Sequence, residues 1–71
     1  MKVLKYPGKL VVEVFAREGD PREGTLAGRW VKPRPVAHEA AERLASDITA
    51  RCDALGIGWP RNLVAALRDD A

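Results

Sequence analysis

The first half of the chain has short apolar runs bounded by Pro- and Gly-containing stretches, and its apolar residues lack a helical period. Residues 9–17 are rich in β-branched side chains, which predicts a strand. Residues 25–32 predict a second strand, and the Gly- and Pro-containing stretch 18–24 predicts the loop between them. Pro33 has no N–H to donate, so we expect the second strand to end before it.

A third strand is expected at the start of the chain. Pro7 and Gly8 suit the two central positions of a type II turn. Such a turn folds residues 2–6 back onto residues 9–13. The three segments then form an antiparallel meander.

The period changes to that of a helix from Val36 onward. Apolar residues at spacings of three and four predict one face of a helix over 36–55, and these are Ala37, Ala41, Leu44, Ile48, Cys52 and Leu55. Pro35 suits the first helical position, and Gly56 suits the left-handed residue that ends a helix. A short second helix is expected over 60–68.

The expected fold class is α+β, with a three-stranded antiparallel β-meander packed against one long amphipathic helix and a short C-terminal helix. The 71 residues form one small domain. A core of this size is expected to supply no more than roughly 3–5 kcal/mol. Cys52 is the only cysteine, so no internal disulfide can reinforce the domain. Association with a partner remains as a source of added stability.

A hairpin symmetric about Pro21 divides the strand residues between two faces. The Val12 face holds Val3, Lys5, Leu10, Val12, Val14, Ala16, Leu26, Gly28 and Trp30. The Val11 face holds Lys2, Leu4, Tyr6, Val11, Glu13, Phe15, Ala27, Arg29 and Val31. We expect the long helix to pack on the Val12 face, through its small residues Ala37, Ala41 and Ala45.

The Val11 face is unusually apolar for a solvated sheet face. Its strip of Leu4, Val11, Phe15 and Val31 is edged by Lys2, Arg17 and Arg29. A sheet with one solvated face normally alternates cleanly between apolar and polar residues. A contiguous apolar patch on a monomer marks a contact site. Two interpretations remain open at this point: the 60–68 helix covers the Val11 face, or another protein chain does.

Residues with catalytic potential are few. We expect His38 to be solvated, Cys52 to be a buried structural thiol, and Glu13 to pair across strands. The Gly-containing stretch 56–58 lacks the Lys-Ser or Lys-Thr of a phosphate loop. Trp59 is expected to fasten the second helix to the core, with an exposed contact residue as the alternative. The sequence therefore predicts no enzyme, metal or cofactor.

The charge distribution favours an anionic partner as the alternative. Residues 1–36 carry eight Lys or Arg against four Asp or Glu, whereas residues 37–71 carry four against six. The strands and helix entry over 9–52 resemble the arm-type DNA-binding domain of phage integrases. That resemblance implies a sheet inserted into the major groove. The candidate nucleic-acid contacts are Lys9, Arg17, Arg22, Arg29, Lys32 and Arg34.

The leading hypothesis is a small interaction module that binds another protein or a second copy of itself. It would act as an inhibitor or adaptor of a larger bacterial or phage assembly. The Arg- and Ala-rich composition suggests that origin. The expected contact residues are Leu4, Val11, Phe15, Arg17, Arg29 and Val31. The N-terminus lacks a signal-peptide core, and the lone cysteine suits a reducing compartment, so we expect a cytoplasmic protein without membrane or small-molecule partners.

Overall fold

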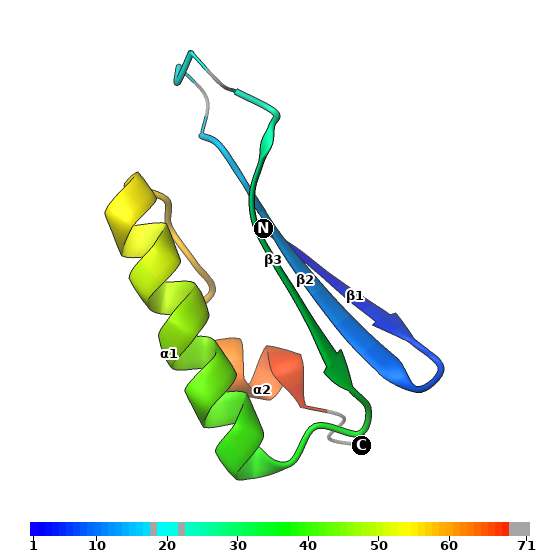
Figure 1. The fold of residues 1–71 in the computed structure, drawn as a ribbon. Coiled ribbons are helices and arrows are strands. Elements are labelled where there is room, and N and C mark those ends of the chain that lie inside the picture. The colour runs from blue at the N-terminus through cyan, green and yellow to red at the C-terminus, as the bar shows by residue number, and fades with distance from the viewer. Residues whose placement is uncertain (18, 22, 69–71) are drawn as a thin grey trace.

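The computed structural model describes residues 1–17, 19–21 and 23–68, and it confirms the α+β fold. One antiparallel sheet has the strand order β1-β2-β3 (Figure 1). Its strands are β1 (Lys2–Tyr6), β2 (Lys9–Phe15) and β3 (Leu26–Pro33). Two helices follow, α1 (His38–Leu55) and α2 (Leu63–Leu67).

The register of the sheet agrees with the symmetric hairpin over most of its length. Val12 pairs with Val3 on one side and with Trp30 on the other. Val11 likewise lies between Leu4 and Val31. The two predicted faces are therefore present, because cross-strand partners project to the same side of a sheet.

Near the loop the predicted register was wrong. A β-bulge between Val14 and Phe15 pairs Phe15 with Leu26, where the symmetric hairpin would pair it with Ala27. The extra residue of a bulge shifts the pairing by one position. β2 also ends at Phe15, and the hairpin continues through a hydrogen bond from the Ala16 N–H to the Thr25 carbonyl at 3.0 Å.

The boundaries on both sides of the segment between β3 and α1 differ from those expected. α1 begins at His38, so Pro35 lies before the helix and is not its first residue. The reason is the segment preceding it: the Arg34 N–H donates to the Gly8 carbonyl at 3.1 Å, and Val36 is buried in the core. β3 also extends to Pro33, which pairs with Lys9 at the sheet edge, where no ladder donor is required.

Gly56 ends α1 as expected. Its φ of 68° is left-handed, and its N–H donates to the Asp53 carbonyl at 3.2 Å. The next N–H, from Ile57, donates to the Cys52 carbonyl at 2.8 Å. These two bonds satisfy carbonyls at the helix end and turn the chain back toward the sheet.

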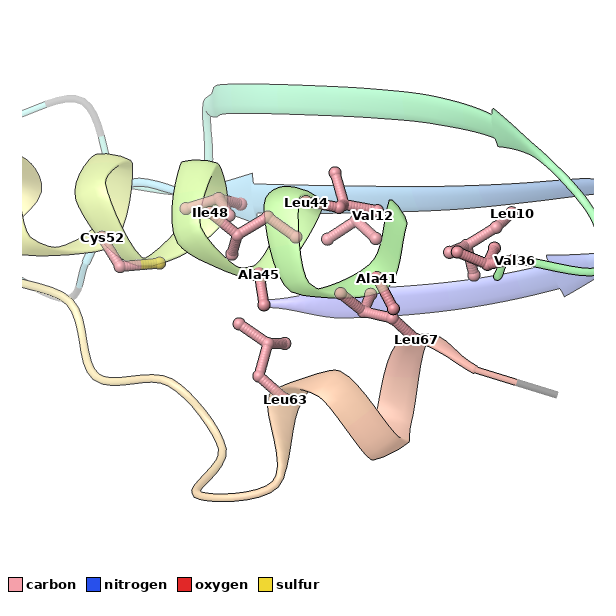
Figure 2. Close-up of a cluster of buried hydrophobic side chains, with 11 residues drawn as sticks. Leu10, Val12, Val36, Ala41, Leu44, Ala45, Ile48, Cys52, Leu63 and Leu67 are labelled. Atoms are coloured by element: carbon pink, nitrogen blue, oxygen red, sulfur yellow. The ribbon is translucent and has the colours of Figure 1, made fainter. Parts of the chain in front are cut away.

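Both helices pack on the Val12 face. In Figure 2, Leu63 of α2 points toward Ala45 of α1. The buried core joins the Val12 face to the two helices and consists of Leu10, Val12, Val14, Val36, Ala41, Leu44, Ala45, Ile48, Cys52, Leu63 and Leu67. Lys5 adds a hydrogen bond from its Nζ to the Arg68 carbonyl at 2.8 Å. Ala37, expected on the buried stripe, is exposed because it precedes the helix.

The location of α2 excludes one of the two covers considered for the Val11 face. Leu63 and Leu67 are buried in the same cluster as Val12, so α2 lies on the side of α1. The turn at Gly56 returns the chain along α1, and the two leucines add to the core beneath it. Within residues 1–17, 19–21 and 23–68, no helix lies on the Val11 face.

Gly28 allows the close packing of side chains on the Val12 face. A Cβ at this position would lie 2.9 Å from Cη2 of Trp30 and 3.5 Å from Cγ of Arg51. The Trp30 indole therefore lies across the Gly28 backbone. Any larger residue at this position displaces the ring.

We predict that Gly28→Ala lowers the free energy of unfolding by about 1–3 kcal/mol, because the added methyl overpacks this contact. Urea denaturation followed by tryptophan fluorescence measures the change. Gly58→Ala is the matched control, since a Cβ added at Gly58 would have no atom within 4 Å. Equal stabilities for the two variants would contradict the packing described.

Candidate functional site

The Val11 face presents its side chains in three rows that each cross the sheet. The middle row is apolar and consists of Leu4, Val11 and Val31. The row on one side is charged and consists of Lys2, Glu13 and Arg29. The row on the other side consists of Tyr6, Lys9 and Pro33. Phe15 lies beyond the charged row, at the end of β2.

The apolar row is separate from the core beneath the helices. Val11 is only 3% exposed, yet it does not belong to the core cluster on the other side of the sheet. Its burial comes from its neighbours on the same face, since the flanking strands place Leu4 and Val31 about 5 Å to either side. Val31 is itself 48% exposed. The row is therefore a densely packed apolar strip with a buried centre at Val11 and an exposed end at Val31.

Positive charge surrounds this row. Arg29 lies beside Glu13, with 3.7 Å between Nε and Oε2. The Lys2 Nζ lies 5.7 Å from the centre of the Phe15 ring, and the Lys9 Nζ lies 5.2 Å from the centre of the Tyr6 ring. Such cation–π contacts are worth about 0.5–1 kcal/mol at exposed positions. They hold the two ammonium groups close to the surface on opposite sides of the row.

The structure brings together most of the residues expected to bind a protein. Leu4, Val11, Val31 and Arg29 occupy adjacent positions on the Val11 face, and Phe15 lies beyond them. Arg17 is the exception. Its guanidinium lies at the C-terminal end of α1, where Nη1 is 3.4 Å from the position of a Cβ built on Gly56. A cation there complements the negative end of the helix dipole.

The residues expected to bind nucleic acid are dispersed. Lys9 and Arg29 lie on the Val11 face, whereas Lys32 pairs with Leu10 and therefore belongs to the opposite face. Arg34 donates from Nη1 to the Tyr6 carbonyl at 2.7 Å, which engages it at the end of the sheet. Arg22 lies outside the described residues.

Sequence reasoning missed the role of Lys9 and Tyr6 beside the apolar strip. It places Tyr6 on the face but not among the contact residues, and it considers Lys9 only for nucleic acid. Side chains alternate between the two sheet faces along β2, and Lys9 stands two positions before Val11. The sequence alone therefore places Lys9 beside the apolar strip.

His38 connects the two helices. Arg68 lies 2.7 Å from His38, between Nη1 and Nδ1, and Nε2 of the imidazole contacts Glu42. A guanidinium only donates, so Nδ1 accepts and Nε2 carries the proton that is donated to the carboxylate. Both ring nitrogens are thus engaged in structural contacts, although the side chain is more than half exposed.

The structure agrees with the expectation for Cys52 but not with the one for Trp59. Cys52 is fully buried as expected, and burial raises the pKa of its thiol above the ordinary value. Trp59 is 40% exposed and lies outside the core cluster, so the expectation that it fastens α2 to the core was wrong. It borders a groove shared with Arg61 and Asn62.

Other site classes find little support in the described residues. They contain no group of three or more His, Cys, Asp or Glu side chains placed to hold a metal ion. None of the helices in this part of the chain combines the length and hydrophobicity needed to cross a membrane. The chain matches no protein-family model, no curated protein and no solved structure.

We predict that Cys52 reacts with Ellman's reagent at pH 8 at least about a hundredfold more slowly in the folded protein than in the urea-unfolded chain. Burial blocks access, and its raised pKa lowers the thiolate fraction, so labelling requires opening of the core. Glutathione in both buffers controls for the effect of urea on the reagent. Equal rates in the two states would show that Cys52 is not buried.

Proposed function

We propose that this protein is a small protein–protein interaction module that binds its partner with the Val11 face. One observation carries the proposal: Leu4, Val11 and Val31 form an apolar row that both helices leave uncovered. Full burial of an exposed aliphatic side chain contributes about 1.5–3 kcal/mol. Because Val11 is already buried by its neighbours, the gain comes from the exposed parts of Leu4 and Val31. The most exposed of them, Val31, has the most to gain from a partner.

The proposal is for binding and not for catalysis. Both ring nitrogens of His38 take part in contacts with Arg68 and Glu42, and the Cys52 thiol is inaccessible. These contacts favour structural roles for the two side chains. The small size of the chain and its uncovered sheet face favour an inhibitor or adaptor of a larger assembly, and the Arg- and Ala-rich composition favours a bacterial or phage origin. The lone cysteine supports a cytoplasmic setting.

We predict that Val31→Asp weakens partner binding by at least about tenfold, because it places a charge in the apolar contact. The free energy of unfolding should change by no more than about 1 kcal/mol, since Val31 is on an edge strand and half exposed. Affinity capture from a lysate of the source organism, with quantitative mass spectrometry, identifies the proteins that are retained.

Ser46→Asp is the control for this experiment, because it adds the same charge at an exposed position of α1. It should retain the same proteins as the unmodified chain. Light scattering of all three proteins reports self-association through the same face. If Val31→Asp changed neither the retained proteins nor the oligomeric state, the proposal would fail.

DNA binding is the second candidate, and one observation favours it. Lys2, Lys9 and Arg29 lie on the same face of the sheet, with Glu13 as the carboxylate among them. If each of these cations contacts one phosphate, the logarithm of the association constant falls with the logarithm of the salt concentration, with a slope of about −2.7. Arg29→Ala should reduce that slope by about 0.9.

Fluorescence anisotropy with a labelled duplex measures this slope across a salt series. The Ser46→Asp variant again serves as the control, since its substitution lies on the outer surface of α1. No binding at low ionic strength would remove this candidate.

A further inference from the structure

We infer that the partner presents an acidic amphipathic helix, which lies across the three strands along the apolar row. This inference rests on the proposed function and specifies the chemistry of the partner. It is carried by two features of the Val11 face: the length and direction of the apolar row, and the cations on both sides of it.

The dimensions of the row match those of a helix stripe. Leu4, Val11 and Val31 lie on successive strands, so the two ends of the row are about 10 Å apart. Helix residues at i, i+3 or i+4, and i+7 lie on one face and span about 10.5 Å along the axis. The outer residues of such a stripe can therefore contact the exposed parts of Leu4 and Val31, with the middle residue above the buried Val11.

The charges on the Val11 face indicate which residues flank the apolar stripe of the partner helix. Lys2 and Arg29 lie on one side of the row, and Lys9 lies on the other. Among the described residues, Glu13 supplies the carboxylate on this face, and it already pairs with Arg29. Residues on both flanks of the docked stripe thus meet positive charge, which favours Asp and Glu at those positions.

The same charges disfavour two other occupants. Two copies of this chain joined through the Val11 face would bring together two sets of three cations, with one carboxylate each. A nucleic acid would satisfy the cations but not the apolar row, since protein–DNA interfaces are more polar than protein–protein ones. An acidic helix with an apolar stripe satisfies both.

Two synthetic helical peptides of about 18 residues test the inference, a length chosen because shorter helices are marginal in water. Both carry the same leucine stripe at helical spacing, one with Glu and the other with Lys on the flanks. We expect the Glu peptide to bind at least about tenfold more tightly, as measured by fluorescence anisotropy. Amide shifts in NMR spectra should map its contact to Leu4, Val11 and Val31.

Charge reversal provides the matched variant. Lys2→Glu combined with Lys9→Glu should weaken the Glu peptide and strengthen the Lys peptide, whereas Val31→Asp should weaken both. Thermal unfolding of the double variant confirms that it is folded. Equal affinity for the two peptides, no binding of either, or no change on charge reversal would overturn the inference.

The outcomes separate this inference from the proposed function. If Val31→Asp abolishes capture of the natural partner while the peptides show no charge preference, the interaction module stands and the acidic helix is wrong. If Val31→Asp leaves capture unchanged, the proposed function itself fails. Competition by a DNA duplex, or dimerisation that Val31→Asp abolishes, would identify the other occupants and also overturn the inference.

Discussion

Packing of both helices against one side of a three-stranded sheet is the interaction on which this structure depends. Leu10, Val12 and Val14 of the central strand are fully buried, and residues of both helices cover them. A 71-residue chain has enough apolar material for one such layer. With α2 added to the layer built by α1, the second side of the sheet receives no cover from the described residues.

Several local features serve this one-sided packing. The left-handed turn at Gly56 sends the chain back along α1, so that Leu63 reaches the core. Gly28 leaves space for the Trp30 ring on the buried side. Lys5 donates to the Arg68 carbonyl after α2, which ties the helical layer to the strands. Arg34 donates to the Tyr6 carbonyl at the end of the sheet. Each contact is small, but a domain with a modest core depends on their sum.

The uncovered side is a consequence of the same constraint, and it is where we place the function. Val11 is packed by its neighbours on the sheet and not by a helix, so the surface it centres is formed by the sheet itself. A preformed surface loses little conformational entropy on binding. The cations beside the apolar row add orientation and selectivity to an otherwise non-directional hydrophobic contact.

The sequence by itself determined the three strands, their central register, the long helix and its glycine end, because each depends on periodicity or on the conformation of single residues. Only the tertiary structure decided where α2 packs, where the β-bulge lies and where the Arg17 guanidinium goes. Periodicity tells which side of an element is apolar but not which neighbour covers it. Leu63, Val64 and Leu67 could have served either face of the sheet, and the return of the chain along α1 selected the Val12 face.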